Sequence, residues 1–299
     1  MKKISVVIPA GKKSFIEVSK DKEKNNLEII VVRGTNPSRN RNIGIKKAKG
    51  DFVAFINAHT MLSKKWEEKI HLFFKKYPEI DIVGGPQLNH KSENFFAKSS
   101  GFALGSIFGS AVVSPRYKGT QLNLNADETQ ITSANLICKK KVFKKLRFDE
   151  NIYPGEDPKL ISDAKKSGFK VAYSPEIITY NKRRTGPLPL AKQIYGYGKT
   201  RPEKESFAET LRKPFFLVPS LFLIYIILLP LLFLINPLFI LPLYLYIVLN
   251  LIFSIYESII NESYLSLLIL PFLFLIIHIS YGIGFLKGLS KLLYLKYEK

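Results

Sequence analysis

The chain has 299 residues, 45 of them Lys or Arg against 24 Asp or Glu, and its formal net charge is +21. So basic a chain should have an anionic partner, but it carries no aromatic and basic module of a known nucleic-acid-binding kind, so we expect no nucleic-acid partner. Its single cysteine, Cys138, excludes an internal disulfide bond and a cysteine-based zinc site. Nearly all the charge precedes Lys213, whereas Phe215 to Phe285 is almost continuously apolar, which indicates a part in water and a part in lipid.

The first two apolar runs predict strands. Ile4–Ala10 and Leu27–Val32 are rich in β-branched residues and end in turn residues, as buried strands of a parallel sheet do. The stretch 12–26 between them is suited to one short helix. The apolar run after the basic N-terminus is too short for a signal peptide, so we expect the first domain on the cytoplasmic side.

A helix and a third strand follow. In the stretch SRNRNIGIKKAKGD, Ser38 is a plausible N-cap, apolar residues recur at helical spacing, and Gly50 marks a stop. Phe52–Ile56 then reads as a buried strand that ends at polar or small residues. Strands alternating with helices predict an α/β fold with right-handed crossovers.

A helix and a short strand follow, and after them comes a segment with two possible interpretations. Ser63–Tyr77 predicts an amphipathic helix with four large residues on one face, Trp66, Ile70, Phe73 and Phe74, and the run IDIVGG predicts another short strand. Residues 94–113 are rich in Gly, Ser and Phe. They are too polar to span a bilayer, and they either lie on its surface or pack in the core.

Three long apolar runs end the chain: Phe215–Ile235, Leu238–Tyr256 and Leu265–Phe285. Each is near the roughly 20 residues needed to cross a bilayer. The first two should form a hairpin split at Asn236-Pro237, with interfacial tyrosines that help to set its depth, Tyr225, Tyr244, Tyr246 and Tyr256. Three spans would put the lysine-rich end outside, against the positive-inside tendency, so either that end is tolerated outside or one run is re-entrant.

Two groups of polar residues lie where a sheet would hold a ligand. Asn57 and His59 end the third strand, and in open α/β sheets ligands bind outside the carboxyl ends of strands. Imidazole and amide oxygen can bind a metal or a phosphate, whereas the plainer interpretation is a turn with His59 packed or solvated. Glu156 and Asp157 follow a Gly-led loop, where a carboxylate can serve as general base or simply favour a helix start.

Basic residues gather at two other places. Arg39 and Arg41 lie near a predicted helix start, which is a natural anion site. The stretch Asn181–Lys204 contains several Lys and Arg residues, with Gln193 among them, just before the apolar runs. It is suited either to a diphosphate or to anionic lipid headgroups.

The order of these pieces resembles glycosyltransferase family 2 over about residues 4–201, and most closely a membrane-attached group typified by succinoglycan biosynthesis glycosyltransferases. The resemblance is carried by ISVVIPA, EIIVV, SRNRNIGIKKAKGDFVAFINAH, VGG, NLICKKKVF, FDENIYPGEDPKLISDAKKSGFKVAYSP, QIYGYGKTR and HISYGIGFLKG. The family implies an inverting enzyme with a Rossmann-like nucleotide-sugar transferase fold of type A (GT-A).

The resemblance also implies site residues. Asp157, with Glu156 beside it, corresponds to the catalytic base that deprotonates an acceptor hydroxyl. A divalent metal, Mg or Mn, is implied at Asn57-Ala58-His59. The donor nucleotide sugar would lie against Pro9, Ala10, Arg33, Arg39, Asn57 and His59, and the acceptor or diphosphate against Asn135, Gln193 and Arg201.

Two positions depart from the family pattern. The acidic residue usual after the second strand, which reads the base, is Arg33, and the usual first aspartate of the metal motif is Asn57. Metal affinity and nucleotide choice depend on both positions. One hypothesis is that the abundant Lys and Arg partly replace the metal's charge.

These features predict a cytoplasmic glycosyltransferase domain (1–201), a basic linker (202–214), a membrane domain of about three helices (215–286) and a basic tail (287–299). The predicted function is transfer of a sugar from a nucleotide-sugar donor to a polyprenyl-linked saccharide or polysaccharide acceptor, by a multi-pass protein of the cell membrane bilayer. The alternative is a catalytically degenerate relative that binds lipid-linked saccharide or a partner transferase, motivated by Arg33 and Asn57.

Overall fold

A computed structural model describes residues 2–16, 27–204 and 213–297. The chain forms two compact units, Met1–Ser92 with Val113–Lys182 and Glu93–Val112 with Arg183–Lys299. The helix predicted over 12–26 lies mostly outside the described residues, and residues 12–16 are not helical. The predicted linker 202–214 also lies mostly outside them, and the predicted domain boundaries stay predictions.

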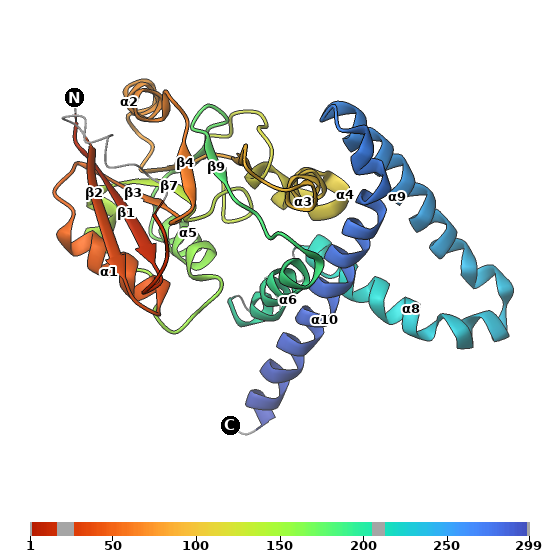
Figure 1. Ribbon diagram of the computed structural model, residues 1–299. Coiled ribbons are helices and arrows are strands. Elements are labelled where there is room, and N and C mark those ends of the chain that lie inside the picture. Colours follow the sequence, from red (N-terminus) through yellow and green to blue (C-terminus); the bar gives the residue numbers. More distant parts are fainter. Residues whose placement is uncertain (1, 17–26, 205–212, 298–299) are drawn as a thin grey trace. The chain divides into compact units, whose positions relative to one another are not determined.

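The first unit is built on a six-stranded sheet of order β2-β1-β3-β7-β5-β8 (Figure 1). Its strands are β1 Ile4–Ala10, β2 Leu27–Arg33, β3 Phe52–Ile56, β5 Ile82–Gly84, β7 Asn135–Lys139 and β8 Val171–Tyr173. The predicted α/β class and the predicted strands are confirmed. The sheet is mixed rather than wholly parallel, because β7 runs antiparallel to both β3 and β5.

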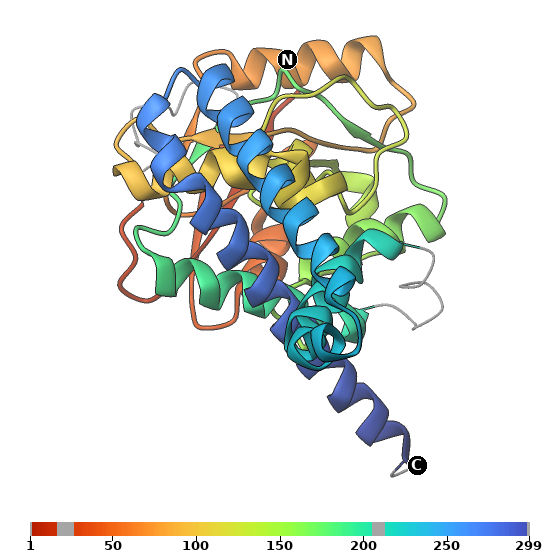
Figure 2. The same cartoon turned by 90° about the vertical axis from the view of Figure 1, so that its right-hand side faces the viewer.

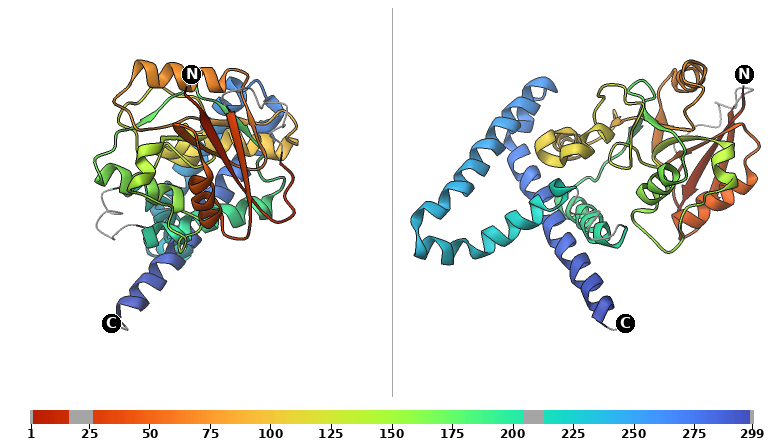
Figure 3. Two further views of the ribbon diagram at one scale, coloured as in Figure 1. Left: turned by 90° about the vertical axis from the view of Figure 1, so that its left-hand side faces the viewer. Right: turned by 180° about the vertical axis from the view of Figure 1, so that it is seen from behind.

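The sheet is covered on both faces, and β3 shows how its sequence allows this. All five residues of β3 are buried, and they alternate between two apolar clusters. One cluster contains the apolar face of α2 (Trp66–Lys76), and the other contains residues of α1 (Pro37–Lys47) and α5 (Glu156–Lys166). Figure 3 shows α2 on one side of the sheet and α1 and α5 on the other.

The ends of α1 differ from the prediction. The N-cap is Asn36, whose side chain accepts a hydrogen bond from the Arg39 backbone N–H, and Pro37 occupies the first turn. Because proline is favoured at the first helical position, the helix starts before Ser38, which is buried inside it and is not the cap. The helix also ends at Lys47, short of Gly50.

A second, three-stranded sheet of order β4-β9-β6 was not predicted. Its strands are β4 Thr60–Leu62, β6 Gln87–Asn89 and β9 Thr179–Asn181. β4 follows the turn at residues 57–59 at once, and α2 begins only at Trp66. The amphipathic face predicted for this helix is confirmed, since its four large apolar residues are all buried.

The second unit contains the apolar helices. Its longer helices are α3 Phe95–Gly105, α6 Pro187–Lys204, α8 Val218–Ile235, α9 Leu241–Ile260 and α10 Leu270–Tyr297. Among the described residues, three single helical stretches are long and apolar enough to cross a membrane: Val218–Ile235, Pro237–Ile260 and Leu270–Leu292. The hairpin between the first two turns at Asn236, as predicted, and Tyr225 Oη donates to the Phe239 carbonyl across it at 2.8 Å.

Residues 94–113, predicted to lie on the bilayer surface or in the core, contain α3 and the short α4 (Ile107–Ser110), bent at the break between them. Taken together, Phe95–Gly105 and Ile107–Arg116 are long and apolar enough to cross a membrane, so the prediction that this segment is too polar to do so is wrong. The break is held by apolar helices of the same unit. His278 of α10 lies 2.8 Å from the Phe108 carbonyl through Nε2 and 3.0 Å from Tyr246 Oη through Nδ1. The segment therefore packs in the core of the second unit (Figure 2).

Candidate functional site

The strand register brings several of the predicted site residues to one edge of the main sheet. β1 and β3 are parallel, so their carboxyl ends lie at the same edge. β7 is antiparallel to β3, and its first residue, Asn135, pairs with Ile56, the last residue of β3. The turn that begins at Asn57 therefore lies beside the residues that lead into β7.

The turn after β3 exposes one of its two predicted ligands. Asn57 is half-buried, Ala58 is buried and His59 is exposed. Thr60 closes the turn, because its backbone N–H donates to the Asn57 carbonyl and its Oγ1 accepts from the Asn57 N–H, each at 3.2 Å. The polar side chains thus sit on a turn with a defined backbone.

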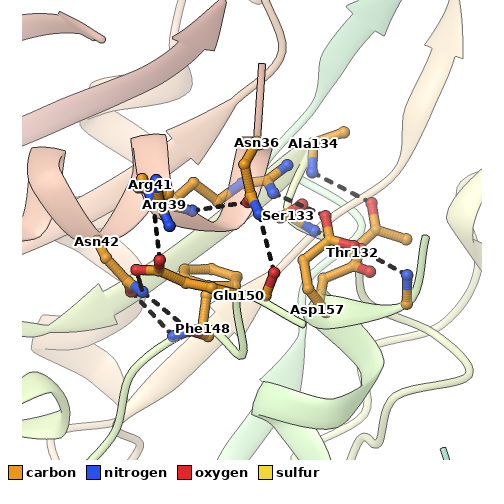
Figure 4. Close-up of polar contacts among 12 residues, drawn as sticks. Asn36, Arg39, Arg41, Asn42, Thr132, Ser133, Ala134, Phe148, Glu150 and Asp157 are labelled. Carbon is orange, nitrogen blue, oxygen red and sulfur yellow. Dashed lines mark hydrogen bonds and ion pairs between the residues drawn. The ribbon is translucent and has the colours of Figure 1, made fainter. Parts of the chain in front are cut away.

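Asp157 lies at the same edge because a residue just before β7 holds it. The Ser133 backbone N–H donates to Asp157 Oδ2 at 3.0 Å (Figure 4). Within the described residues, Asp157 Oδ1 accepts no hydrogen bond, so one oxygen of this half-buried carboxylate is available to a ligand. Asp157 is also in the first turn of α5.

A chain of side-chain hydrogen bonds joins the turn to the segment that holds Asp157. Thr60 Oγ1 donates to Asn181 Oδ1, and Asn181 Nδ2 donates to Gln87 Oε1 at 2.8 Å. Gln87 Nε2 donates in turn to Thr132 Oγ1, which accepts from the Ala134 N–H at 3.2 Å. The second, small sheet therefore ties both sides of the edge together.

Glu156 has a different role from its neighbour. Its Oε1 accepts from Arg41 Nη1 at 2.7 Å, and each side chain is only 5% exposed. Its Oε2 accepts from the Gly155 N–H at 2.8 Å. Burial and the charge of Asp157 raise the pKa of Glu156, although the Arg41 guanidinium opposes this. Both oxygens are thus bound internally, which makes Glu156 a residue that fixes the start of α5.

The same segment is attached to α1 by further polar contacts. Asn42 Nδ2 donates to the Phe148 carbonyl and to Glu150 Oε1, and Asn42 Oδ1 accepts from the Phe148 N–H at 3.0 Å. Arg39 Nε donates to Glu150 Oε2 at 2.9 Å. These contacts, drawn in Figure 4, fix the segment 148–157 that leads to Asp157. Arg39 itself is exposed and remains accessible to a ligand.

The predicted nucleotide residues border the end of β1. Pro9 is half-buried and Ala10 is buried. Arg33, which replaces the family's acidic residue, donates through Nη1 to the carbonyls of Gly11, Lys12 and Ser14. Arg33 thus holds the loop after β1 in place, a contact that an acidic residue could not make.

Asn135 is bound on all sides by the protein itself. Its side chain is fully buried and has three partners: Oδ1 accepts from Trp66 Nε1 at 3.1 Å, and Nδ2 donates to the carbonyls of Ile177 and Pro86. These bonds use both amide hydrogens and the oxygen within the protein. Asn135 therefore holds the start of β7, and its predicted contact with an acceptor sugar stays a prediction.

A scan against family models matches residues 11–147 to the family described as Glycosyl transferase family 2. The chain carries a family 2 glycosyltransferase domain. The predicted family is thereby confirmed, whereas the resemblance to the succinoglycan group stays a prediction.

Among curated proteins, the minor teichoic acid biosynthesis protein GgaB of Bacillus subtilis is 30% identical over 156 residues. The match covers 50% of this chain and only 16% of GgaB. Among solved structures, S. aureus TarS matches with 13% identity and a TM-score of 0.43, over 68% of this chain and 40% of that chain. The Pyrobaculum calidifontis mannosyltransferase PcManGT, solved with GDP-Man and Mn²⁺, matches with 10% identity and a TM-score of 0.44, over 71% of this chain and 64% of that chain.

The side chains at this edge of the sheet do not fit a metal ion whose ligands all come from the protein. The described residues contain no group of three or more His, Cys, Asp or Glu side chains that could hold a metal ion. The turn itself offers one amide and one imidazole, Asn57 and His59, whereas Mg²⁺ is usually bound through carboxylates and substrate phosphates.

The two remaining predicted residues belong to the second unit. Gln193 Nε2 donates to Tyr197 Oη at 2.7 Å, and Gln193 Oε1 accepts from Arg184 Nε at 3.3 Å. Arg201 is buried, and its guanidinium stacks 3.7 Å from the centre of the Phe216 ring. Their predicted contact with the acceptor or diphosphate stays a prediction.

Proposed function

We propose that this chain is a membrane-bound inverting glycosyltransferase that moves a sugar from a nucleotide-sugar donor to a polyprenyl-linked saccharide or polysaccharide acceptor. The proposal rests chiefly on one observation. Asp157, held by the Ser133 N–H, lies at the same sheet edge as the turn of Asn57 and His59. Ligands of open α/β sheets bind at this edge.

The chemistry follows from the free oxygen of Asp157. Its Oδ1 takes the proton of an acceptor hydroxyl while the hydroxyl oxygen attacks the anomeric carbon of the donor. The bond from that carbon to the diphosphate oxygen breaks, and the nucleoside diphosphate leaves with the electron pair. Attack from the face opposite the leaving group inverts the anomeric centre.

The charge of the leaving diphosphate needs stabilisation. His59 and Arg39 are exposed polar groups on the elements that border the edge. Preorganised donors of this kind act on charge that develops in the transition state. The net charge of +21 supports the hypothesis that basic side chains supply part of what a metal supplies elsewhere.

The acceptor class has two supports. A candidate membrane hairpin in the same chain suits an acceptor whose polyprenyl tail stays in the bilayer. The relative GgaB is named for minor teichoic acid biosynthesis, which suggests a cell-surface polymer as the product. We place the catalytic domain on the cytoplasmic face of the cell membrane, where nucleotide sugars are made.

The experiment is a donor screen with full-length protein in detergent, a polyprenyl-linked acceptor and release of nucleotide as the readout. Asp157→Asn should lower turnover by about 10²–10⁴-fold, the usual contribution of a general base. Asp163→Asn is the matched control, because Asp163 lies on the same helix in a partly exposed ion pair with Lys159. Equal turnover of the two variants would refute the role of Asp157.

The alternative, a degenerate relative that binds saccharide or a partner transferase without catalysis, is motivated by Asn57 and Arg33. It predicts donor or saccharide binding with no nucleotide release. The screen distinguishes the two functions, since turnover above that of Asp157→Asn excludes the alternative. Turnover with and without chelator then decides the metal requirement.

A further inference from the structure

Helix α10 is in backbone contact with α6 along its middle. A Cβ added at Gly198 of α6 would lie 2.3 Å from the Tyr281 carbonyl oxygen, and one added at Gly284 would lie 2.1 Å from the Tyr195 carbonyl oxygen. One turn further on, a Cβ at Gly288 would meet the Lys199 carbonyl oxygen at 2.0 Å. Only glycine permits this approach, so the two helices pack closely from Tyr281 to Gly288.

α6 is a polar helix that a bilayer core would not accommodate. It contains Lys192, Lys199 and Arg201, as well as Gln193, and it is not among the candidate spans of the described residues. Charged side chains at the bilayer centre are costly and rare. Along the chain, α6 begins soon after the first unit ends at Lys182, and it precedes the first candidate span. We therefore place α6 outside the bilayer, on the side of the catalytic domain.

The middle of α10 also meets the beginning of α8. A Cβ added at Gly282 would lie 2.6 Å from the Pro219 carbonyl oxygen, within the first turn of α8. The Tyr281 ring stacks at 6.4 Å from the ring of Phe216, on which the Arg201 guanidinium lies. Tyr281 thus lies beside both α6 and the start of the apolar hairpin.

These contacts conflict with a membrane span at α10. Its apolar stretch is Leu270–Leu292, with Tyr281 at the midpoint, so a span would carry α6 and its charges to the bilayer centre. The part before the α6 contact, Leu270 to Ser280, is about 16 Å long at about 1.5 Å per residue. That is about half of the ~30 Å hydrocarbon core. α10 is also 39% buried within the protein, against 11% for each of the other two candidates.

We propose that α10 does not cross the bilayer, and that α8 and α9 form a hairpin whose two ends lie on the side of α6. Because α6 and Tyr281 touch, the chain between them must cross an even number of times. The exposed Lys287 and Lys291 then lie on the side of the catalytic domain, in line with the positive-inside tendency. The exposed apolar residues before Tyr281, Phe272 and Leu275 among them, face lipid.

Thiol labelling tests this topology, and it measures no transfer activity, so its failure is distinct from a failure of the proposed function. Cys138 is fully buried, so the native chain supplies an unreactive background. Single cysteines are placed at two exposed positions of α10, Ser290→Cys and Lys291→Cys, and at an exposed position of α2, Lys75→Cys. Cells that express the 299-residue chain are treated with a membrane-impermeant maleimide before and after permeabilisation.

The expected result is that both α10 cysteines behave like Lys75→Cys, protected in intact cells and labelled once the cells are permeabilised. A cysteine on an outward-facing marker protein verifies that the reagent was active. Labelling of Ser290→Cys and Lys291→Cys in intact cells, with Lys75→Cys protected, would establish an odd number of crossings and overturn the proposal.

Discussion

Removal of the buried cation next to the proposed base should destabilise the catalytic unit strongly. Arg41 Nη1 and Glu156 Oε1 are 2.7 Å apart, with each side chain 5% exposed. Removal of one partner of such a pair leaves an uncompensated buried charge and costs about 3–5 kcal/mol. Arg41 Nε is buried and has no hydrogen-bond partner, so its loss relieves a small penalty. We therefore expect Arg41→Met to lower the free energy of unfolding by about 3 kcal/mol, near the lower end of that range.

The assay is thermal unfolding of the full-length protein in detergent. In a domain of this size each kcal/mol shifts Tm by about 2–4 °C, so Arg41→Met should lower the Tm of the catalytic unit by roughly 6–12 °C. Arg39→Met is the matched control, because the Arg39–Glu150 pair is 67% and 37% exposed. Exposed pairs contribute at most about 1 kcal/mol, so its Tm should change by a few degrees at most.

A double variant separates the effect on stability from the effect on catalysis. Arg41→Met with Glu156→Leu replaces the ion pair by apolar side chains of similar size, which is often neutral or stabilising, so Tm should return toward that of wild type. Turnover of the double variant should nevertheless be below that of wild type, because Glu156 no longer fixes the first turn of α5 that carries Asp157. The reasoning is refuted if Arg41→Met costs no more stability than Arg39→Met.

Three further outcomes are expected. Burial raises the pKa of Glu28, but hydrogen bonds from Ser5 and from the Lys49 backbone N–H lower it by more, so the net pKa lies below the usual 4.5. Its stabilisation is present above that value and is lost as pH falls through the folded pKa, so Glu28→Gln should lower Tm at neutral pH and match wild type in acid. Gly198→Ala should destabilise the second unit by about 1–3 kcal/mol through overpacking, and Gly119→Ala, with no atom within 4 Å of its added Cβ, should not. Asn57→Asp adds a carboxylate beside His59 and should make nucleotide release more responsive to added Mn²⁺; an unchanged chelator response would contradict this.

The strands and apolar helices were predictable because their signals are local. Phe52–Ile56 is apolar at every position, and such a run fits a strand covered on both faces. The long runs near the C-terminus identified α8 and α9 by length alone. The start of α1 was missed by two residues, because Ser38 and Asn36 are both good caps and the proline between them decides which one is used.

The long-range pairs could not be predicted in the same way. Arg41 and Glu156 are 115 positions apart, and nothing in either local pattern indicates that they meet. The antiparallel direction of β7 depends in the same way on the path of the chain before it. Asn135 was recognised as special from its motif, but its role depends on Trp66, which lies 69 positions away.

The three carboxylates near the edge divide their roles by what binds them. Glu156 gives both oxygens to Arg41 and the Gly155 N–H, and Glu150 accepts from Arg39 and Asn42. Asp157 alone of the three keeps an oxygen without a partner among the described residues. A general base needs that free oxygen and a fixed position, and the first two carboxylates supply the position. The adjacent acidic pair in the sequence is therefore one anchor and one base, and the two single variants, Glu156→Gln and Asp157→Asn, should differ accordingly: the first lowers Tm, and the second lowers turnover at an unchanged Tm.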